Sequence, residues 1–227
     1  MSKINDPWVL IQNDEFDSAI EFIDSMFNET QDIFMLNNKN LALFHLKKYG
    51  EALNQSQQLI SFRNGSTSVD FLNLGIANWI LGNNTIAIET WLKAQGCIYK
   101  DAAGGMDIQV FLYLAGVKSK QNSLKENAIK AIKKLLKSKR ATNWPGPIGH
   151  YLLNDITEPE LISYVSNIPI LKERNLCQAD FAIAIKSLER GDEQNYYRKL
   201  QDCVNLGSKA YLEQMFYLAK GELEIRN

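Results

Sequence analysis

The chain is poor in the residues that most often bind metals or carry out chemistry. Its 227 residues include two histidines and three cysteines. Cys97, Cys177 and Cys203 have neither Cys-x-x-Cys spacing nor a neighbouring histidine, so the sequence has no zinc or redox motif. The cysteines are odd in number and fall in predicted helices, which indicates reduced, small apolar core residues. We therefore expect no metal and no cofactor.

Long apolar runs are also missing. No stretch approaches the roughly 20 apolar residues that a membrane-spanning helix needs. The start of the sequence, from Met1 to Pro7, lacks the apolar core of a signal peptide. These two absences predict a cytoplasmic protein without a membrane partner.

The chain has almost no net charge, but its charges are unevenly distributed. The formal net charge is −1, which argues against a general nucleic-acid binder. Residues 118–140 contain eight lysines and one arginine against the single Glu126, so this stretch carries +8 and the rest of the chain −9. The sequence thus predicts one basic hairpin in an otherwise acidic protein.

The most informative feature of the sequence is an internal repeat. Three similar stretches place the marker alanines Ala19, Ala52 and Ala87 at intervals of 33 and 35 residues. These intervals bracket the period of about 34 residues of a two-helix repeat. A small residue is needed at this point because the second helix crosses the first helix and the next unit closely.

The unit from about residue 69 to residue 100 shows the pattern most completely. Its first helix has a large residue, an apolar residue and a small residue at fixed offsets. Its second helix has an aromatic residue between two small residues. These markers closely resemble the tetratricopeptide (TPR) pattern: Phe71, Leu74, Gly75, Ala87, Trp91 and Ala94. The preceding unit, 33–66, has Asn40 where glycine is usual. The resemblance implies an all-α fold, a right-handed α-solenoid of antiparallel helical hairpins.

We expect one solenoid domain over residues 1–227. Gly104-Gly105 lacks the Lys-Ser/Thr of a phosphate loop and indicates a hinge, and Thr157 with Glu160 predicts a capping box. The last helix is expected to cover the apolar end of the stack, as a terminal repeat must. The hairpins are expected at about 4–28, 33–66, 69–100, 106–140, 144–166 and 175–206, with the closing helix at 208–224.

A second resemblance concerns residues 144 to 224. The segments that carry it are Trp144-Pro145-x-Pro147, Tyr151-Leu, Ile156-Thr-x-x-Glu160-Leu161, Cys177-x-Ala179-Asp180-Phe181 and Ala219-x-x-Glu222-Leu223. They are similar to the C-terminal half of bacterial TPR adaptor lipoproteins, which implies an adaptor that binds proteins. The sequence departs from that family at its start, where no lipid-attachment cysteine follows a signal peptide, so envelope localisation is not carried over.

Partner binding is expected on the concave groove, which the first helices of a TPR stack line. Asn38 and Asn73 recur at one repeat position, and paired amides can hold an extended peptide by its backbone. Local bonding of these amides between neighbouring helices is the alternative. The predicted groove positions are Asn37, Asn38, Leu41, Leu72, Asn73, Ile76, Ile80, Tyr113 and Val117.

The lysine-rich helix predicted from Leu124 to Arg140 is amphipathic. The favoured interpretation is a solvated face that keeps the protein soluble, and the alternative is a docking stripe for an acidic partner or for nucleic acid. No aromatic residue interrupts the lysines, which disfavours base stacking. The basic patch comprises Lys125, Lys130, Lys133, Lys134 and Lys137.

No set of catalytic residues is evident. His45 has no carboxylate three or four residues away, and a pairing of Cys177 with His150 matches no family spacing. The main hypothesis is a non-enzymatic protein–protein interaction module, in its sharper form an inhibitor or immunity protein that neutralises a toxin. A nucleic-acid-binding regulator that uses residues 118–140 is the alternative, and an enzyme that uses either histidine is the third.

Overall fold

The computed structural model describes residues 6–226, and this part of the chain is almost entirely helical. Apart from an isolated bridge between Thr67 and Tyr99, it contains no β-structure. The predicted all-α fold class is confirmed. Among these residues, no helix combines the length and apolar character needed to cross a membrane.

Twelve of the helices pair in sequence as hairpins, and a thirteenth follows. Two short 3₁₀ helices, Lys139–Thr142 and Gly207–Ala210, precede α9 and α13. The pairs are α1 (Pro7–Gln12) with α2 (Phe16–Thr30), α3 (Met35–His45) with α4 (Tyr49–Phe62), α5 (Ser68–Ile80) with α6 (Asn84–Ala94), α7 (Met106–Lys118) with α8 (Asn122–Leu135), α9 (Gly146–Leu152) with α10 (Glu158–Ser163), and α11 (Pro169–Glu189) with α12 (Glu193–Asn205); the last helix is α13 (Gln214–Ile225).

All six hairpins share one turn geometry. In each turn a single residue has a left-handed backbone, and the next N–H donates to the carbonyl five residues earlier at 2.8–2.9 Å, which is the Schellman arrangement. Glycine occupies this position in two turns only; the six residues are Asp14, Lys47, Gly82, Lys120, Asn154 and Gly191. They lie 33, 35, 38, 34 and 37 residues apart, so the repeat continues beyond the three units with clear markers.

Residue size is matched where the two helices of a hairpin cross. A Cβ on Gly75 of α5 would lie 2.0 Å from the indole nitrogen of Trp91 on α6, so only glycine leaves room for that ring. In the preceding hairpin the equivalent pair is Asn40 and Ser56, also 16 residues apart, and the Asn40 amide donates to the serine hydroxyl at 2.8 Å. Asparagine is tolerated at the usual glycine position there because its partner is small.

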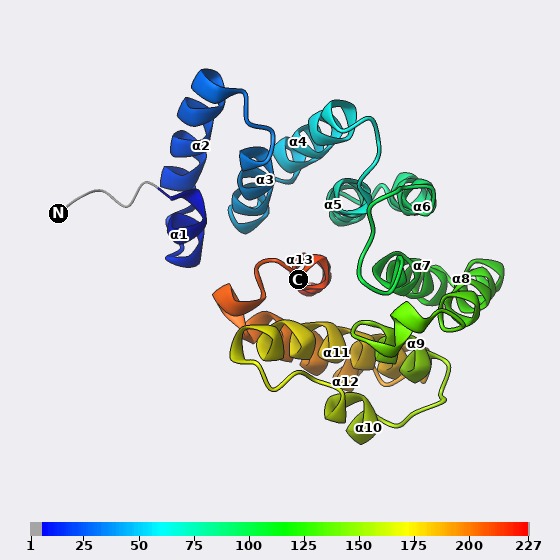
Figure 1. Ribbon diagram of the computed structural model, residues 1–227. Coiled ribbons are helices and arrows are strands. Elements are labelled where there is room, and N and C mark those ends of the chain that lie inside the picture. The colour runs from blue at the N-terminus through cyan, green and yellow to red at the C-terminus, as the bar shows by residue number, and fades with distance from the viewer. Residues whose placement is uncertain (1–5, 227) are drawn as a thin grey trace.

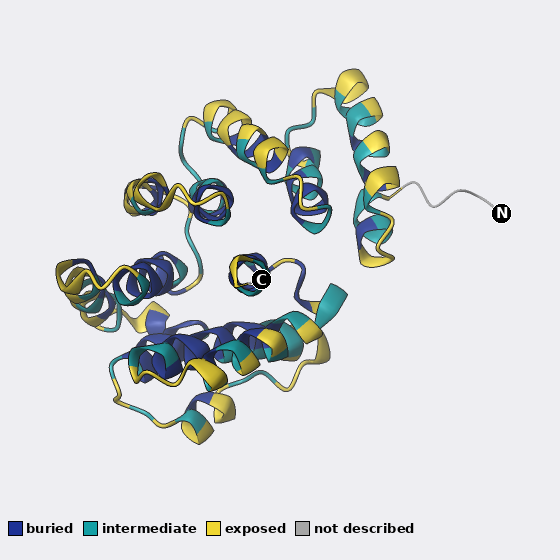
Figure 2. Ribbon diagram, turned by 180° about the vertical axis from the view of Figure 1, so that it is seen from behind, coloured by how far each residue is buried: buried dark blue, intermediate teal, exposed yellow. Residues whose placement is uncertain are grey.

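The hairpins α1–α8 follow an arc, α9–α12 close its open side, and α13 lies inside (Figure 1). Successive hairpins contact each other through α2 and α3, α4 and α5, and α6 and α7. The helices that border the interior are mostly buried, whereas the outer helices keep an exposed face (Figure 2). The apolar core therefore follows the inside of the arc and continues into α11 and α13.

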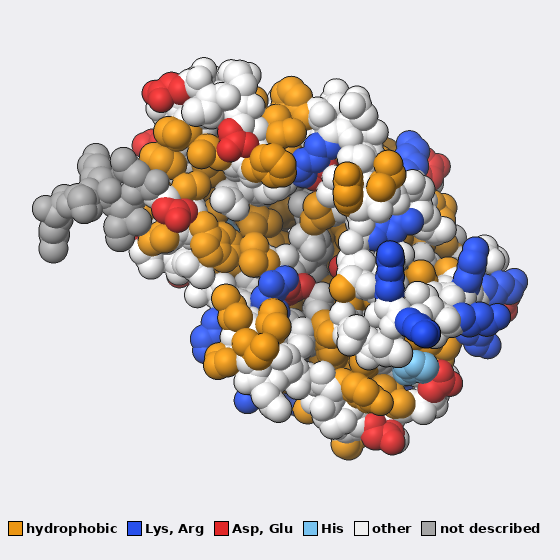
Figure 3. Space-filling model, viewed as in Figure 1, with side chains coloured by type: hydrophobic (Ala, Val, Ile, Leu, Met, Phe, Trp, Pro, Cys, Tyr) orange, Lys and Arg blue, Asp and Glu red, His pale blue; other side chains and the backbone are white. Residues whose placement is uncertain are grey.

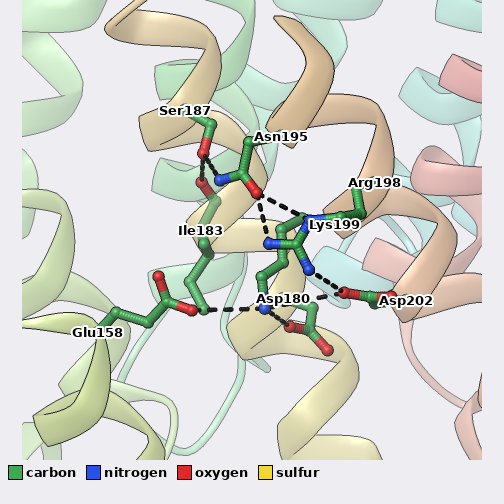
Figure 4. Close-up of polar contacts among 8 residues, drawn as sticks. All are labelled: Glu158, Asp180, Ile183, Ser187, Asn195, Arg198, Lys199 and Asp202. Atoms are coloured by element: carbon green, nitrogen blue, oxygen red, sulfur yellow. Dashed lines mark hydrogen bonds and ion pairs between the residues drawn. The ribbon is translucent and has the colours of Figure 1, made fainter. Parts of the chain in front are cut away.

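A polar network holds the C-terminal helices together (Figure 4). Lys199 on α12 reaches Asp180 on α11 at 2.8 Å and Glu158 at the start of α10 at 3.4 Å. The predicted capping box of α10 is confirmed: Thr157 and Glu160 bond to each other's backbone N–H. The ion pairs of Lys199 thus join α10, α11 and α12.

Candidate functional site

The concave surface of α3, α5 and α7, here called the inner face, is covered by α13. A Cβ on Gly221 of α13 would lie 2.4 Å from a side-chain carbon of Ile80, so helix and wall are in close contact. Tyr217 lies 3.2 Å from the His45 ring nitrogen, and Trp79 donates to Glu222 at 2.6 Å. The chain's own last helix thus occupies the inner face.

Five of the predicted groove positions are buried, because helices of the same chain, α13 among them, pack against the inner face. The buried ones are Leu41, Leu72, Asn73, Ile76 and Tyr113. The half-buried ones are Asn37, Asn38, Ile80 and Val117.

The closing helix also differs from expectation, since it covers the inner face and not only the end of the stack. Asn37 accepts a hydrogen bond from Arg63 at 3.1 Å, which favours local bonding of that amide. Assignment of the nine groove positions to partner binding stays a prediction.

A cleft of about 570 Å³, here called the central cleft, opens between the repeat helices and the C-terminal helices. A hollow with hydrophobic side chains on its rim is visible on this face of the molecule (Figure 3). Among the predicted groove positions, Leu72 borders it. Its other walls are Thr67 to Val69, Tyr99 to Ala102, Asp107, Trp144, Pro145, Tyr164, Ser166, Leu171, Arg174, Asn175, Gln178 and Leu212 to Gln214.

Four large apolar or aromatic side chains surround the mouth of the central cleft and face solvent. The exposed fractions are 65% for Tyr99, 55% for Tyr164, 38% for Leu171 and 42% for Leu212. Exposed apolar side chains scattered over a surface need no explanation, but several around one concavity mark a site of interaction. None of the four is among the predicted site residues, because they lie in loops and at a helix start, outside the repeat pattern.

Backbone hydrogen bonds position this apolar rim. Tyr99 bonds to the loop before α5 and to the first residue of that helix: its N–H donates to the Ser66 carbonyl, and the Ser68 N–H donates to the Tyr99 carbonyl, each at 2.9 Å. On the opposite wall, the side chain of Asn175 accepts from the Ser166 N–H at 3.1 Å and holds the loop that carries Tyr164. The rim is therefore anchored to the fold on both sides.

The floor of the central cleft is polar but largely neutralised. Arg174 donates to Glu213 at 2.5 Å, although burial still keeps the pKa of that carboxyl above its usual value. Burial, together with the neighbouring Asp101 and Glu213 carboxylates, raises the pKa of Asp107 well above its usual value. Asp101 accepts from the N–H groups of Gly105 and Asp107, each at 2.8 Å, and so caps α7.

The hinge predicted at Gly104-Gly105 has left-handed backbone at both residues.

The basic patch lies on α8 and, with Lys137, on the turn that follows it. The apolar residues Leu124, Ala128 and Ile132 of α8 are buried. Lys130, Lys133, Lys134 and Lys137 are exposed. Lys125 departs from the patch, because it is half-buried and lies 3.1 Å from Glu189 on α11.

The two histidines have different surroundings, and two of the cysteines lie together in the core. His45 stacks on Phe16 with ring centroids 4.3 Å apart, and burial, reinforced by Lys220, lowers its pKa to about 3. His150 lies 3.1 Å from Asp155 on the surface. The Cys177 and Cys203 sulfurs lie 2.8 Å apart in the core, and burial raises the pKa of Cys177 well above its usual value. Residues 6–226 contain no group of three or more His, Cys, Asp or Glu side chains that could hold a metal ion.

Comparisons with solved structures add a likeness in fold. No protein-family model matches the chain, and no curated protein matches it. The arrangement of helices is similar to the TPR2AB domain of yeast Sti1, in a structure described as its complex with pHSP90, at 18% sequence identity and a TM-score of 0.36, over 93% of this chain and 94% of that chain. The six equivalent turns and the Gly75–Trp91 packing show, from this chain itself, a stack of repeated helical hairpins.

Proposed function

We propose that the protein is a non-enzymatic protein-binding module whose partner docks in the central cleft. The observation that carries the proposal is the convergence of Tyr99, Tyr164, Leu171 and Leu212 on one cleft of about 570 Å³. Tyrosine provides large, rigid contact area at low entropic cost and is enriched at the energetic centres of protein interfaces. A partner would insert apolar side chains here and bond to the polar floor.

The burial of the inner face under α13 supports the central cleft as the docking surface. α13 contributes Met215, Phe216, Tyr217 and Leu218 to the core, each nearly fully buried. A partner that bound the inner face would have to displace these side chains. Binding at the central cleft needs no such rearrangement.

Charge-introducing variants of the rim test the proposal. Leu171→Asp and Tyr164→Asp place a carboxylate at the mouth of the cleft, at exposed positions where folding tolerates it. Ile86→Asp on α6 is the matched control, because Ile86 is 51% exposed and is not a cleft residue. Tagged protein is purified from its own cells and co-purifying proteins are quantified by mass spectrometry. We expect one stoichiometric partner with wild type and Ile86→Asp, and its loss from both cleft variants; equal recovery with all four proteins contradicts the proposal.

The sharper form of the hypothesis, an inhibitor or immunity protein whose partner is a toxin, comes from the small chain and its lack of a recognisable catalytic set. It is tested by expressing the captured partner alone and together with this protein. Growth arrest by the partner alone, relieved by wild type and not by Leu171→Asp, is the expected result. A partner that is harmless when expressed alone contradicts this form and leaves the cleft assignment intact.

A further inference from the structure

The outward face of α8 carries a row of unpaired positive charges. Lys133 and Lys134 lie three and four residues after Lys130 on the same side of α8, and Lys137 follows in the turn after the helix. All four are exposed, and none forms an ion pair with a carboxylate of residues 6–226. The lysines gather over α8 in the space-filling view (Figure 3). Like charges at these spacings destabilise a helix, so the row is a cost to the free protein.

The row leads into a hollow of about 510 Å³ between α8, α9 and α11. Lys133, Lys186 and Arg190 line this hollow together with the apolar side chains of Ile129 and Leu152. Lys186 is buried, and its ammonium lies 2.5 Å from Glu189 and 3.4 Å from the Leu152 carbonyl.

A single carboxylate balances the positive charges of the hollow. Glu189 accepts from Lys186, Lys125 and the Tyr113 hydroxyl. Burial opposes ionisation of Glu189, but these three donors outweigh it and its pKa lies below the usual value. Lys133 and Arg190 are left without a carboxylate partner in the described part of the chain. The hollow therefore has a net positive charge beside an apolar wall.

We propose that the row on α8 and this hollow together bind an acidic segment of a partner protein, with an apolar side chain of that segment against Ile129 and Leu152. The three lysines on α8 span about 6 Å along the helix axis, and Lys137 extends the row beyond the helix end. Several carboxylates of one short segment match this row. This surface is separate from the central cleft, so the proposal does not depend on the cleft.

The charge pattern favours a partner protein over two other occupants. Nucleic acid is disfavoured because residues 118–140 contain no aromatic side chain for base stacking, and Tyr113, which borders the hollow, is buried. A second copy of this chain is disfavoured because many of its carboxylates already form ion pairs. Examples are Asp24 with Lys39, Asp70 with Arg63, and Glu213 with Arg174.

Fluorescence anisotropy with a defined peptide tests the proposal. The probe is a fluorescein-labelled peptide of glutamate and leucine about 12 residues long, and the control peptide has glutamine in place of glutamate. The variant Lys130→Glu/Lys134→Glu reverses two charges of the row. The matched control, Lys93→Glu/Lys172→Glu, reverses two exposed lysines that do not line the hollow. Circular dichroism verifies that both variants fold.

We expect the wild-type protein to bind the glutamate peptide and not the glutamine peptide, with affinity that falls as salt is raised. The charge reversal in the row should weaken binding about tenfold, and the control pair should leave it unchanged. Equal affinity for both peptides, or equal loss in both variants, overturns the proposal. Tighter binding of single-stranded RNA of the same charge than of the glutamate peptide also overturns it, in favour of a nucleic-acid site.

Discussion

The indole N–H of Trp79 donates a hydrogen bond of 2.6 Å to the carboxylate of Glu222, a residue 143 positions later in the chain. The same carboxylate accepts from Tyr196 at 2.6 Å and from the Lys118 ammonium at 2.5 Å. Glu222 is 1% exposed. One buried carboxylate thus joins α5, α7, α12 and α13, and it fixes the last helix inside the arc.

Loss of this carboxylate should destabilise the protein strongly. In Glu222→Ala, three donors lose their acceptor, and the Lys118 charge loses its partner. We expect the free energy of unfolding to fall by about 3 kcal/mol, the range found when one partner of a buried ion pair is removed. Urea unfolding followed by circular dichroism measures the change. Glu21→Ala, at an exposed position on α2, is the control and should change stability by less than about 0.5 kcal/mol. A similar loss in both variants would show that Glu222 is not an anchor of the fold.

Two glycine-to-alanine substitutions should have opposite effects. In Gly75→Ala the added methyl overlaps the Trp91 indole, and we expect a loss of about 2 kcal/mol from overpacking. In Gly50→Ala on α4 the methyl meets nothing within 4 Å, so the lower entropy of the unfolded chain should stabilise the protein by about 0.5 kcal/mol. Thermal or urea unfolding of the two variants measures both changes. Equal stability of the two proteins would contradict the close packing of α5 against α6.

Stability should decrease as the pH falls below the ordinary pKa of histidine. His45 stays neutral in the folded protein down to a pKa of about 3, whereas the unfolded chain binds a proton near pH 6.5. The unfolded state therefore binds more protons between these two values, and stability falls as pH falls through this window. From pH 7 to pH 5 the loss from this residue should be about 2 kcal/mol. His45→Gln should show a correspondingly weaker pH dependence over that range in urea unfolding, and an unchanged dependence would contradict the buried neutral ring.

Much of the fold could be predicted from the sequence, because repeat packing depends on residue size at fixed spacings. Gly75 and Trp91 occupy the positions that the TPR resemblance assigned to them, and Gly82 has the left-handed backbone expected at a helix terminus. Two of the later turns lack this signal, since Lys120 and Asn154 take the left-handed conformation without glycine. At these turns the tertiary packing of the hairpins outweighs the preference of left-handed backbone for glycine.

The candidate site was harder to predict than the fold. Whether Ile76 faces a groove or a core depends on what covers α5. The sequence pattern of α13 does not show where that helix packs. Tyr99 and Leu212 lie in connecting segments that helical periodicity does not describe. They meet at one cleft only because the C-terminal helices fold back toward the middle of the stack.

Hydrogen–deuterium exchange of the free protein tests the central claim, that α13 is part of the core and leaves the central cleft as the accessible concave site. We predict that the amides of α13 exchange as slowly as those of α5 and α7, because all three open only when the domain unfolds. The loop that carries Tyr99 should exchange faster. Rapid exchange throughout α13, with α5 and α7 still protected, would show that α13 detaches in the native protein and that the inner face is open to a partner.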